Sequence, residues 1–551
     1  MVRSRREALL LGLASAGGLA APAQAAPKKP AGGPAAKAAT WRAGVEGQRR
    51  ADLGNGLYRN PVLSGDRPDP SLLKDGDDYY AVFSSFLYYP GAVVWRSRDL
   101  VNWTPVGPAL KAPLGSVWAL DIAKHDGRYF IYIPVLVAGT PKGLPFKIYV
   151  VHANSMSGPW SEPVDMDVNG YIDPGHAVGE DGKRYLFLND GHRVKITDDG
   201  LRRDGPVEKV YDGWPIPDDW VIEAPAPEGP KILRRGGWFY LFSGQGGTAG
   251  PPTSHMVVVA RSRSIHGPWE NCPHNPIVRT TSIDEPWWSR GHATPVLGPA
   301  GDWWFAYHGY ENGFRTLGRQ MLLEPFEWTA DGWPKALGGD LSRALPKPKG
   351  APSGEHGLAL SDDFRADTLG TKLAFYAPKA GYLDRVRFGA DGLVLQGQGK
   401  GPADSSPLTF IAGDRSYEIT VDLEVQGAGQ GGLLLFYNDK LFCGAGAEAD
   451  KLRAYKFGVE QEYPPPGAMQ GRRLTLGLVN DENVVSLYLR QGGAAWRRIV
   501  SYEVAGYNHN MADGFMSLRP AIFASGEGQV VFRSLSYRAV ERGTQGPPRR
   551  A

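Results

Sequence analysis

A repeat of about 50 residues runs through the first two thirds of the chain and limits its fold more than any other feature. Each unit has a polar turn with glycine, followed by an aromatic-rich run in which apolar residues recur at every second position. The five runs are DGDDYYAVFSS (75–85), HDGRYFIYIPV (125–135), EDGKRYLFLND (180–190), RGGWFYLFSG (235–244) and AGDWWFAYHG (300–309). They begin 50, 55, 55 and 65 residues apart.

A turn that contains tryptophan recurs between these runs, although the third unit has the weaker match ITDDGLRRDG (196–205). The four turns are SRDLVNWTPVG (97–107), SMSGPWSEP (155–163), SIHGPWENCP (264–273) and PFEWTADGWP (325–334). Self-similarity at this period, with strand and turn content, is typical of a β-propeller in which each repeat forms one four-stranded blade. The sequence therefore predicts a five-bladed propeller over residues 55–345, with a chance row of unrelated hairpins as the alternative.

One polar residue lies just upstream of each aromatic run. These residues are Asp69, Asp121, Asp173, Glu228 and His292, separated by 52, 52, 55 and 64 positions. Because the first strand of each blade lines the central channel of a propeller, we expect the five side chains to meet at one end of that channel. Burying several carboxylates together is costly and raises some of their pKa values. The set therefore favours a functional site over a series of structural turns.

Prolines on both sides of Asp69 restrict its backbone and keep it out of a helix. Taken alone, this stretch is typical of a turn that needs an Asx residue. Two carboxylates that flank a bond, one donating a proton and one activating water, are the groups that glycoside hydrolysis requires. The chain has no phosphate-cradling Gly-Lys loop and no His-Glu-x-x-His zinc motif. The sequence therefore lacks the motifs that phosphate-binding or zinc-dependent enzymes of these kinds would need.

The N-terminus has the features of an export signal. Paired arginines precede an apolar stretch that ends in Ala-x-Ala at Ala25, which predicts a twin-arginine signal over residues 1–25, with an ordinary secretory signal as the alternative. We expect the mature protein in the periplasm or outside the cell. Residues 26–54 are predicted to form a flexible linker. No other segment has the apolar run that a membrane span needs.

Charge and cysteine content exclude several classes of protein. The net charge is +3 and no basic cluster is present, so nothing in the sequence favours binding to nucleic acid or to an acidic membrane. Cys272 and Cys443 are the two cysteines, which excludes a disulfide scaffold and argues against a catalytic thiol. A single bridge between them is the alternative.

The last third of the chain has a different pattern. LPKPKGAPSGEHG (345–357) is typical of a hinge between domains. Beyond it, segments such as SYEITVDLEV (416–425) and GGLLLFYND (431–439) alternate as half-buried strands. Repeated strands without a clear helix predict an antiparallel β-sandwich over residues 358–540, and hence an all-β chain.

The propeller region resembles glycoside hydrolase family 43, a five-bladed propeller family of enzymes that trim arabinan and xylan. The motifs that carry the resemblance, in order, are NPVLSGDRPDPSLL (60–73), SRDLVNW (97–103), DPGHAVGEDGKRYLF (173–187), EGPKILRRGGWFYLFSGQGGT (228–248) and LGRQMLLEPFEWTADGWP (317–334). In addition, LSDDFRADTLG (360–370) resembles the start of the lectin-like sandwich that many members carry. In those relatives the sandwich packs on the propeller and can lend a loop to the pocket; an independent carbohydrate-binding module is the alternative.

The resemblance implies roles for three carboxylates. Asp69 resembles the general base that deprotonates the attacking water, and Glu228 resembles the general acid, for which Glu223 is the rival. Asp173 resembles the third carboxylate, which tunes the pKa and the orientation of the acid. Such enzymes invert the anomeric centre, which implies that the carboxyl groups lie about 6.5–9.5 Å apart. No cofactor is required.

The remaining site residues are assigned more broadly. Arg319 resembles a sugar-binding arginine, because a guanidinium fork suits paired hydroxyl groups. His292 is open to three interpretations: a ligand of a structural calcium ion, a sugar contact, or a hydrogen-bonded channel residue. Trp118 belongs either to the sugar pocket or to the core. Asp121 is expected to be a structural channel residue.

The expected function is therefore exo-acting, inverting hydrolysis that releases β-D-xylosyl or α-L-arabinofuranosyl units from plant-type oligosaccharides or polysaccharides. After the Asp-Pro pair the family more often has serine and an aromatic residue, whereas this chain has Gly175, His176 and Ala177, so the identity of the sugar stays open. The alternatives are a galactose-releasing glycosidase of the same family, a propeller that only binds carbohydrate and, third, a structural or partner-binding propeller.

Overall fold

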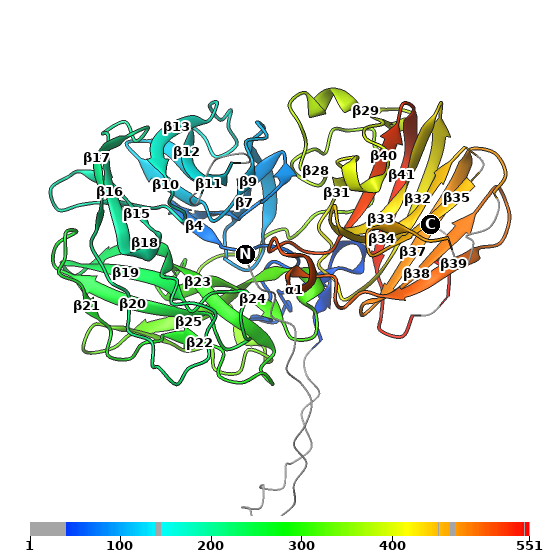
Figure 1. The fold of residues 1–551 in the computed structure, drawn as a ribbon. Helices are drawn as coiled ribbons and strands as arrows, with labels where there is room; N and C mark the ends of the chain where they lie inside the picture. Colours follow the sequence, from blue (N-terminus) through cyan, green and yellow to red (C-terminus); the bar gives the residue numbers. More distant parts are fainter. Residues whose placement is uncertain (1–39, 138–144, 450, 463–468, 545, 550–551) are drawn as a thin grey trace, which may run out of the picture. The chain divides into compact units, whose positions relative to one another are not determined.

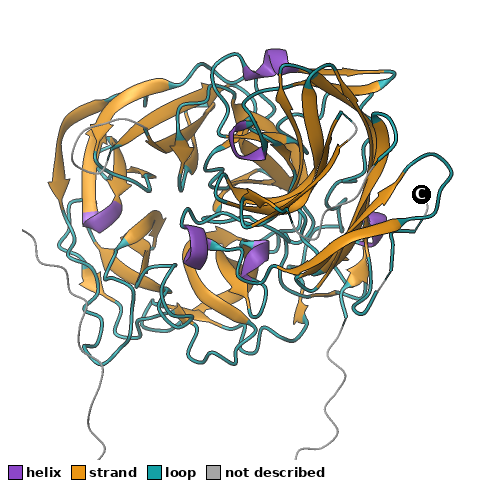
Figure 2. Cartoon of the chain, turned by 45° about the vertical axis from the view of Figure 1, so that its right-hand side comes forward, coloured by secondary structure: helices purple, strands orange, loops and turns teal. Residues whose placement is uncertain are grey.

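The computed structural model describes residues 40–137, 145–449, 451–462, 469–544 and 546–549. Within these ranges nearly all regular structure is strand (Figure 2). The one α-helix among the described residues is α1 (His509–Ala512), and the other helical segments are short 3-10 turns. The predicted export signal and residues 26–39 of the predicted linker lie outside the described residues. In the described part of the chain, no helix is long and apolar enough to cross a membrane.

Five antiparallel sheets follow one another along the chain, and each contains at least four strands in sequence order. The first two sheets (Figure 1) contain β4 (Ser71–Asp75), β5 (Asp78–Val82), β7 (Gly91–Ser97) and β8 (Thr104–Leu110), then β10 (Asp121–His125), β11 (Arg128–Leu136), β12 (Phe146–Ala153) and β13 (Val164–Asn169), with β9 (Ser116–Val117) paired to β11. The third contains β14 (Gly175–Val178), β15 (Arg184–Leu188), β16 (His192–Ile196) and β17 (Arg203–Lys209).

The fourth and fifth sheets repeat the pattern. They contain β18 (Glu228–Arg235), β19 (Trp238–Gln245), β20 (Met256–Ser262) and β21 (Glu270–Asn271), with β22 (Val278–Arg279) paired to β20, and then β23 (Trp287–Leu297), β24 (Trp303–Glu311), β25 (Arg319–Trp328) and β26 (Pro334–Ala336). The first strands of the five sheets contact one another in order, and β23 returns to contact β4. The predicted five-bladed propeller is therefore confirmed, and each aromatic run forms the second strand of its blade.

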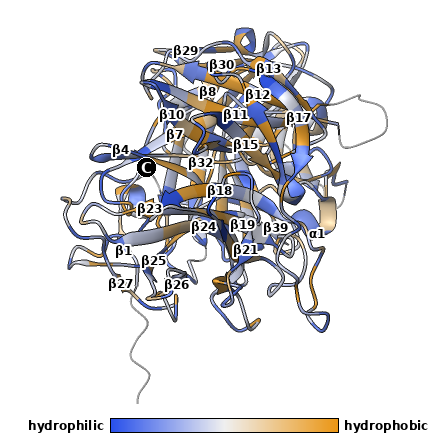
Figure 3. Cartoon of the chain, turned by 90° about the vertical axis from the view of Figure 1, so that its left-hand side faces the viewer, coloured by the Kyte–Doolittle hydropathy of each residue, from blue (hydrophilic) through white to orange (hydrophobic). Residues whose placement is uncertain are grey.

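The ends of the propeller segment are held together by main-chain pairing. Strand β3 (Leu57–Tyr58) pairs with β27 (Leu345–Pro346), and the backbone N–H of Val62 donates to the carbonyl of Met321 on β25 at 2.9 Å. Apolar side chains that alternate along the strands fill the space between blades, so orange and blue residues alternate along many ribbons in Figure 3.

Two further antiparallel sheets form the predicted C-terminal sandwich. The first runs in the order β29 (Val386–Gly389), β30 (Gly392–Gln396), β41 (Gln529–Ala539), β32 (Ser416–Gln426), β37 (Arg473–Asp481), β38 (Val484–Arg490) and β39 (Arg497–Glu503). The second runs in the order β36 (Val459–Glu460), β35 (Lys451–Lys456), β34 (Leu441–Glu448), β33 (Gly429–Asn438), β40 (Arg519–Gly526), β31 (Leu408–Thr409), β28 (Ala374–Tyr376) and β6 (Tyr88–Tyr89). Its last strand, β6, is contributed by the first blade of the propeller.

The segment before the propeller differs from the prediction. Instead of a flexible linker up to residue 54, β1 (Arg42–Ala43) pairs with β2 (Arg49–Arg50). The Arg49 guanidinium donates to Glu311 of the propeller at 2.9 Å, and its backbone N–H donates to Asp414 of the sandwich at 2.8 Å. These buried polar contacts hold the stretch around Arg49 in place. Its composition alone did not distinguish this stretch from a flexible linker. Cys272 and Cys443 are both buried and free, so the alternative of a bridge between them is wrong.

Candidate active site

A pocket of about 120 Å³ lies where the first strands of the blades begin. All six residues predicted for the site line it, namely Asp69, Trp118, Asp173, Glu228, His292 and Arg319. We call it the carboxylate pocket. Four of the five polar residues that the repeat identified, Asp69, Asp173, Glu228 and His292, thus meet at one end of the channel, whereas Asp121 does not line the pocket.

Asp69 is held by contacts from three sides. Its backbone lies in the left-handed region (φ 56°), and its N–H donates to Nδ1 of His308 at 3.0 Å. Its Oδ1 accepts from Nη1 of Arg319 at 2.8 Å, and its Oδ2 accepts from the hydroxyl of Ser84 at 2.5 Å. Burial alone would raise the pKa of Asp69, but Arg319, His308 and His292 together hold it well below its ordinary value. Asp69 is therefore an ionised carboxylate.

Asp173 and Glu228 are linked through Gly229, the second residue of β18. The Oδ2 of Asp173 accepts from the backbone N–H of Gly229 at 3.0 Å. Gly229 has φ 57°, and a Cβ there would lie 2.7 Å from the ring of His292, so only glycine fits after Glu228. Burial, and then the charge of Asp69, raise the pKa of Asp173.

Glu228 has the opposite electrostatic environment to Asp69. Its side chain keeps 20% of its exposure and faces the pocket, and its Oε1 lies 3.4 Å from Nε2 of His255. Burial, followed by the charges of Asp173 and Asp69, raises the pKa of Glu228 well above its ordinary value. The pocket therefore favours the neutral form of Glu228.

Three buried histidines pack behind the carboxylates, and two of them, His255 and His308, were not predicted. The rings of His255 and His308 stack with centroids 5.2 Å apart, and His292 lies 3.6 Å from Oδ1 of Asp69. Burial lowers the pKa of all three, so the imidazoles are neutral. His255 lies on the third strand of its blade, out of phase with the polar positions that the repeat identified.

The surroundings of His292 do not fit a calcium ion. Calcium takes six to eight oxygen ligands, whereas the carboxylate next to His292 is Asp69, whose two oxygens are already bound to Arg319 and Ser84. Among the described residues, no group of three or more His, Cys, Asp or Glu side chains could hold a metal ion.

Asp121, which was expected to be structural, and Glu223, the rival for the acid, also have defined places. Asp121 is buried outside the carboxylate pocket, where it pairs with Lys231 and accepts from the hydroxyl of Ser71 at 2.9 Å. Glu223 is exposed at the rim, and its Oε2 accepts the backbone N–H groups of Ala249 and Gly250 at 2.7 and 2.9 Å. Both carboxylates therefore have structural partners.

Aromatic rings form one wall of the pocket. Trp118 packs edge-on against Phe86 and Phe515, with centroids 6.4 and 5.6 Å away. Phe515 lies in the sandwich, between α1 and β40, so the two parts of the chain build the pocket together. No signal in the sequence singled out Phe515, because it lies outside the propeller repeat.

A protein-family model described as glycosyl hydrolases family 43 matches residues 58–334, which is half of the chain and includes every carboxylate of the pocket. The chain belongs to this family. Two curated proteins are similar to this chain. A non-reducing end alpha-L-arabinofuranosidase from Bacteroides ovatus is 34% identical over 54% of this chain and 55% of its own length. A xylan 1,3-beta-xylosidase from a Vibrio species is 32% identical over 50% of this chain and 56% of its own length.

These matches span only a little over half the length of either relative. A solved family 43 structure covers more. The GH43 BlXynB protein from Bacillus licheniformis superposes with a TM-score of 0.78 at 26% identity, over 88% of this chain and the whole of that one. The likeness to this family 43 structure therefore extends beyond the propeller into the C-terminal sandwich.

Proposed function

We propose that this family 43 chain is an exo-acting, inverting glycoside hydrolase that releases β-D-xylosyl or α-L-arabinofuranosyl units from plant-type oligosaccharides or polysaccharides. The observation that carries the proposal is the opposite shift of two carboxyl pKa values in one pocket, that of Asp69 downward and that of Glu228 upward. Such a pair supplies a base and an acid at the same pH.

The reaction uses the chain's own side chains in a single displacement. The Asp69 carboxylate takes a proton from a water molecule, whose oxygen attacks the anomeric carbon. Glu228 gives its proton to the glycosidic oxygen as the bond to the anomeric carbon breaks, so the leaving sugar departs as a neutral alcohol. Asp173, bound to the N–H of Gly229, fixes the backbone beside the acid and keeps its pKa raised.

The shape of the carboxylate pocket supports release of single terminal units. Its small volume and its wall of Phe86, Trp118 and Phe515 suit one sugar ring, with the apolar ring faces against aromatic side chains. Arg319 is placed to contact sugar hydroxyl groups while it holds Asp69. The names of the two curated relatives support both an arabinofuranosyl and a xylosyl unit.

The test compares hydrolysis of aryl β-D-xylopyranoside, aryl α-L-arabinofuranoside and aryl β-D-galactopyranoside, with the Asp69→Asn variant as the control. We expect release from the first or second substrate, loss of that release in the variant, and a product of inverted configuration by NMR. Release only from the galactoside would replace the proposed sugar. No release from any of them, together with measurable binding of xylo-oligosaccharides, would favour a propeller that only binds.

A further inference from the structure

A groove of about 690 Å³ lies where the third blade leads into the fourth. Its volume is more than five times that of the carboxylate pocket. Most of its wall is formed by the segment 212–227, which connects β17 to β18. Trp214 and Trp220 lie in that segment, and we call the hollow the tryptophan groove.

The tryptophan groove shares its rim with the carboxylate pocket. Ala226 lines both hollows. Ile222 lines the groove, whereas Glu223 and Ala224, which follow it in the chain, line the pocket. The strip 222–226 is therefore the rim over which a long molecule passes from the pocket into the groove.

This rim lies on the acid side of the pocket. Glu228 comes two residues after Ala226, whereas Asp69 lies just before β4 of the first blade. In a single displacement, water attacks from the side of the base, and the leaving group departs on the opposite side, next to the acid. The part of the substrate that follows the released unit therefore lies beside Glu228, where the tryptophan groove begins.

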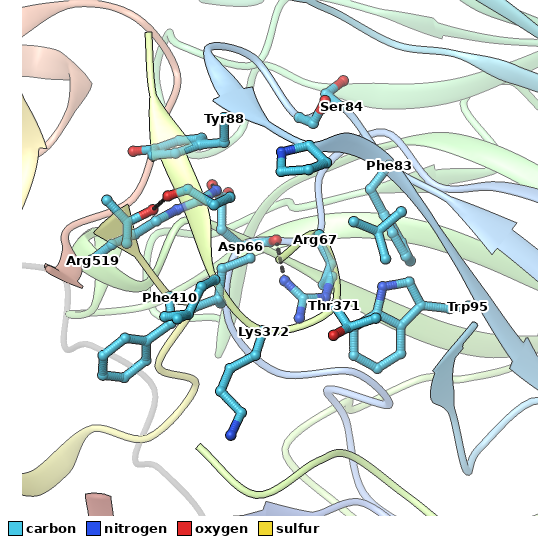
Figure 4. Close-up of a pocket in the computed structure, with 18 residues that line it drawn as sticks. Asp66, Arg67, Phe83, Ser84, Tyr88, Trp95, Thr371, Lys372, Phe410 and Arg519 are labelled. Atoms are coloured by element: carbon cyan, nitrogen blue, oxygen red, sulfur yellow. Dashed lines mark hydrogen bonds and ion pairs between the residues drawn. The ribbon is translucent and has the colours of Figure 1, made fainter. Parts of the chain in front are cut away.

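The cavity in Figure 4 does not adjoin the pocket in this way. It has a volume of about 80 Å³, lies between the first blade and the sandwich, and shares no lining residue with the carboxylate pocket. Asp66 and Arg519 line it and form an ion pair at 2.8 Å. This pair joins the propeller to the sandwich, and a substrate that extends from the pocket reaches the tryptophan groove instead.

Both tryptophans are held by residues outside their segment. Gln245, which is buried, accepts from the backbone N–H of Trp214 at 2.8 Å and donates to its carbonyl at 3.0 Å. The guanidinium of Arg279 lies 3.3 Å from the ring centroid of Trp220 and donates to the carbonyl of Thr253 at 3.0 Å. The same wall contains four prolines, namely Pro215, Pro217, Pro225 and Pro227. A wall that is ordered before binding loses little entropy when a ligand binds.

We propose that the tryptophan groove binds the leaving part of the substrate, a neutral chain of sugar units that follows the unit released at Glu228. This inference rests on the proposed hydrolysis. The half-buried indole rings, with centroids 5.9 Å apart, offer apolar faces to the C–H faces of sugar rings. The carboxylate pocket suits one ring, so a groove of more than five times its volume holds several.

The charges of the tryptophan groove favour a neutral chain. Asp190, Asp212 and Asp218 line it, and Lys209 is the one basic residue among the described residues that do so. Lys209 lies 3.5 Å from Asp212, so the remaining negative charge has no cation in the lining to offset it. A uronic acid in the chain would therefore be repelled. Because these charges are exposed, salt weakens the repulsion.

The first test compares two substrates in the wild type and in Trp220→Ala. One is the methyl glycoside of the released unit, whose leaving group is too small to reach the groove, and the other is an unbranched neutral oligosaccharide with the same terminal unit. We expect kcat/KM on the oligosaccharide to fall about tenfold, as for the loss of one aromatic contact, and kcat/KM on the methyl glycoside to stay close to wild type.

Trp238→Ala is the matched control. Trp238 lies at the other end of β19 from Gln245, and an arginine also covers its ring, with Arg263 at 3.7 Å from the centroid. This variant should change neither rate. Equal losses on both substrates in Trp220→Ala would place the effect in the carboxylate pocket and overturn the proposal. An unchanged rate on the oligosaccharide, or the same loss in Trp238→Ala, also overturns it.

A second comparison tests the preference for a neutral chain. The wild type is given two oligosaccharides that carry one branch at the same unit, a neutral pentose in one and a uronic acid in the other. The uronic acid should lower kcat/KM at low ionic strength, and added sodium chloride should narrow the difference. Equal rates at low ionic strength, or a difference that salt does not change, would contradict the role of the aspartates.

Binding to Asp69→Asn separates the groove from the proposed function. Calorimetry with the unbranched oligosaccharide should give a Kd that rises about tenfold when Trp220→Ala is added. If the wild type hydrolyses no substrate but this difference is found, the proposed function fails and the groove assignment stands. If hydrolysis is found without the difference in Kd, the groove assignment fails alone.

A crystal structure covers the case in which Trp220→Ala does not fold. Asp69→Asn with the same oligosaccharide should show sugar rings beyond the rim, against the indole rings of Trp214 and Trp220. An oligosaccharide that leaves the carboxylate pocket in another direction overturns the proposal.

Discussion

Arg319 and Asp69 form a buried ion pair, with Nη1 of the arginine 2.8 Å from Oδ1 of the aspartate and both side chains less than a tenth exposed. The cation stabilises the charged form of the carboxylate that it touches. Among the described residues, no arginine or lysine forms an ion pair with Glu228, which lies near two other carboxyl groups, so the same pocket favours its neutral form. An asymmetrically placed guanidinium thus helps to separate a base from an acid.

Asp69→Asn should abolish nearly all hydrolysis while the protein stays folded. The amide cannot take a proton from water, and loss of a general base costs about 10²–10⁴-fold in rate. The measurement is kcat/KM on the preferred aryl glycoside, with circular dichroism and Tm as the check on folding. A folded variant that kept a tenth of the wild-type rate would make Asp69 a structural turn residue.

Glu228→Gln should affect substrates according to their leaving groups. Poor leaving groups, such as a second sugar, need the proton that Glu228 supplies, whereas activated aryl groups leave without it. We therefore expect turnover of oligosaccharides to vanish and turnover of a dinitrophenyl glycoside to fall far less. Glu223→Gln is the matched control and should leave both rates close to wild type. Equal losses on both substrates would argue against the assignment of Glu228 as the acid.

Asp173→Asn should move the basic limb of the pH profile to lower pH. The carboxyl group of Asp173 helps to raise the pKa of Glu228, so its removal lowers that pKa and the acid loses its proton earlier as pH rises. The measurement is kcat/KM against pH on an oligosaccharide substrate. A fall in rate without any displacement of the basic limb would mean that Asp173 acts only through its bond to Gly229.

Phe515→Ala should weaken binding of the sugar more than it slows the chemical step. The ring closes one wall of the carboxylate pocket but touches neither reacting carboxyl group in the contacts described above. We expect KM to rise about tenfold with a smaller change in kcat, as for the loss of one aromatic contact. Phe457→Ala removes an exposed aromatic residue from the same sandwich and should change neither constant. A large fall in kcat at constant KM would contradict this role.

Glu311→Gln should destabilise the whole chain. The buried carboxylate accepts from Arg49 before the propeller and from Arg415 in the sandwich, so removing its charge leaves two arginines unpaired at a cost of about 3–5 kcal/mol. Burial would raise the pKa of Glu311, but Arg49 and Arg415 outweigh it and lower the pKa. The stabilisation is therefore present above the unfolded-state pKa and is lost as pH falls through the folded-state value.

Denaturant unfolding of wild type and Glu311→Gln at neutral pH and in acid measures this effect. The difference in the free energy of unfolding should shrink in acid, where the wild-type carboxylate is protonated. A difference that does not depend on pH would assign the effect to packing instead of charge.

The propeller and most of its candidate site could be predicted because one period controls both. A residue such as Asp173 recurs in phase with the aromatic strands, so its place at the channel follows from the repeat. His255 and Phe515 could not be predicted in this way, since one lies on the third strand of a blade and the other reaches the pocket from a different fold. Arg49 was assigned to a linker because its order depends on Glu311 and Asp414, which are distant in the sequence.

The edge strand β6 has a consequence for biosynthesis. Blade 1, which contains β6, is synthesised long before β28 leaves the ribosome. The sandwich sheet is therefore completed when β28 pairs with β6 of a propeller that has already been synthesised. If the two halves were produced from separate genes, the sandwich would expose the unpaired backbone of β28, which is a template for aggregation. The propeller half would lack Phe515. Engineers who exchange modules among such enzymes should therefore treat the two halves as one inherited unit.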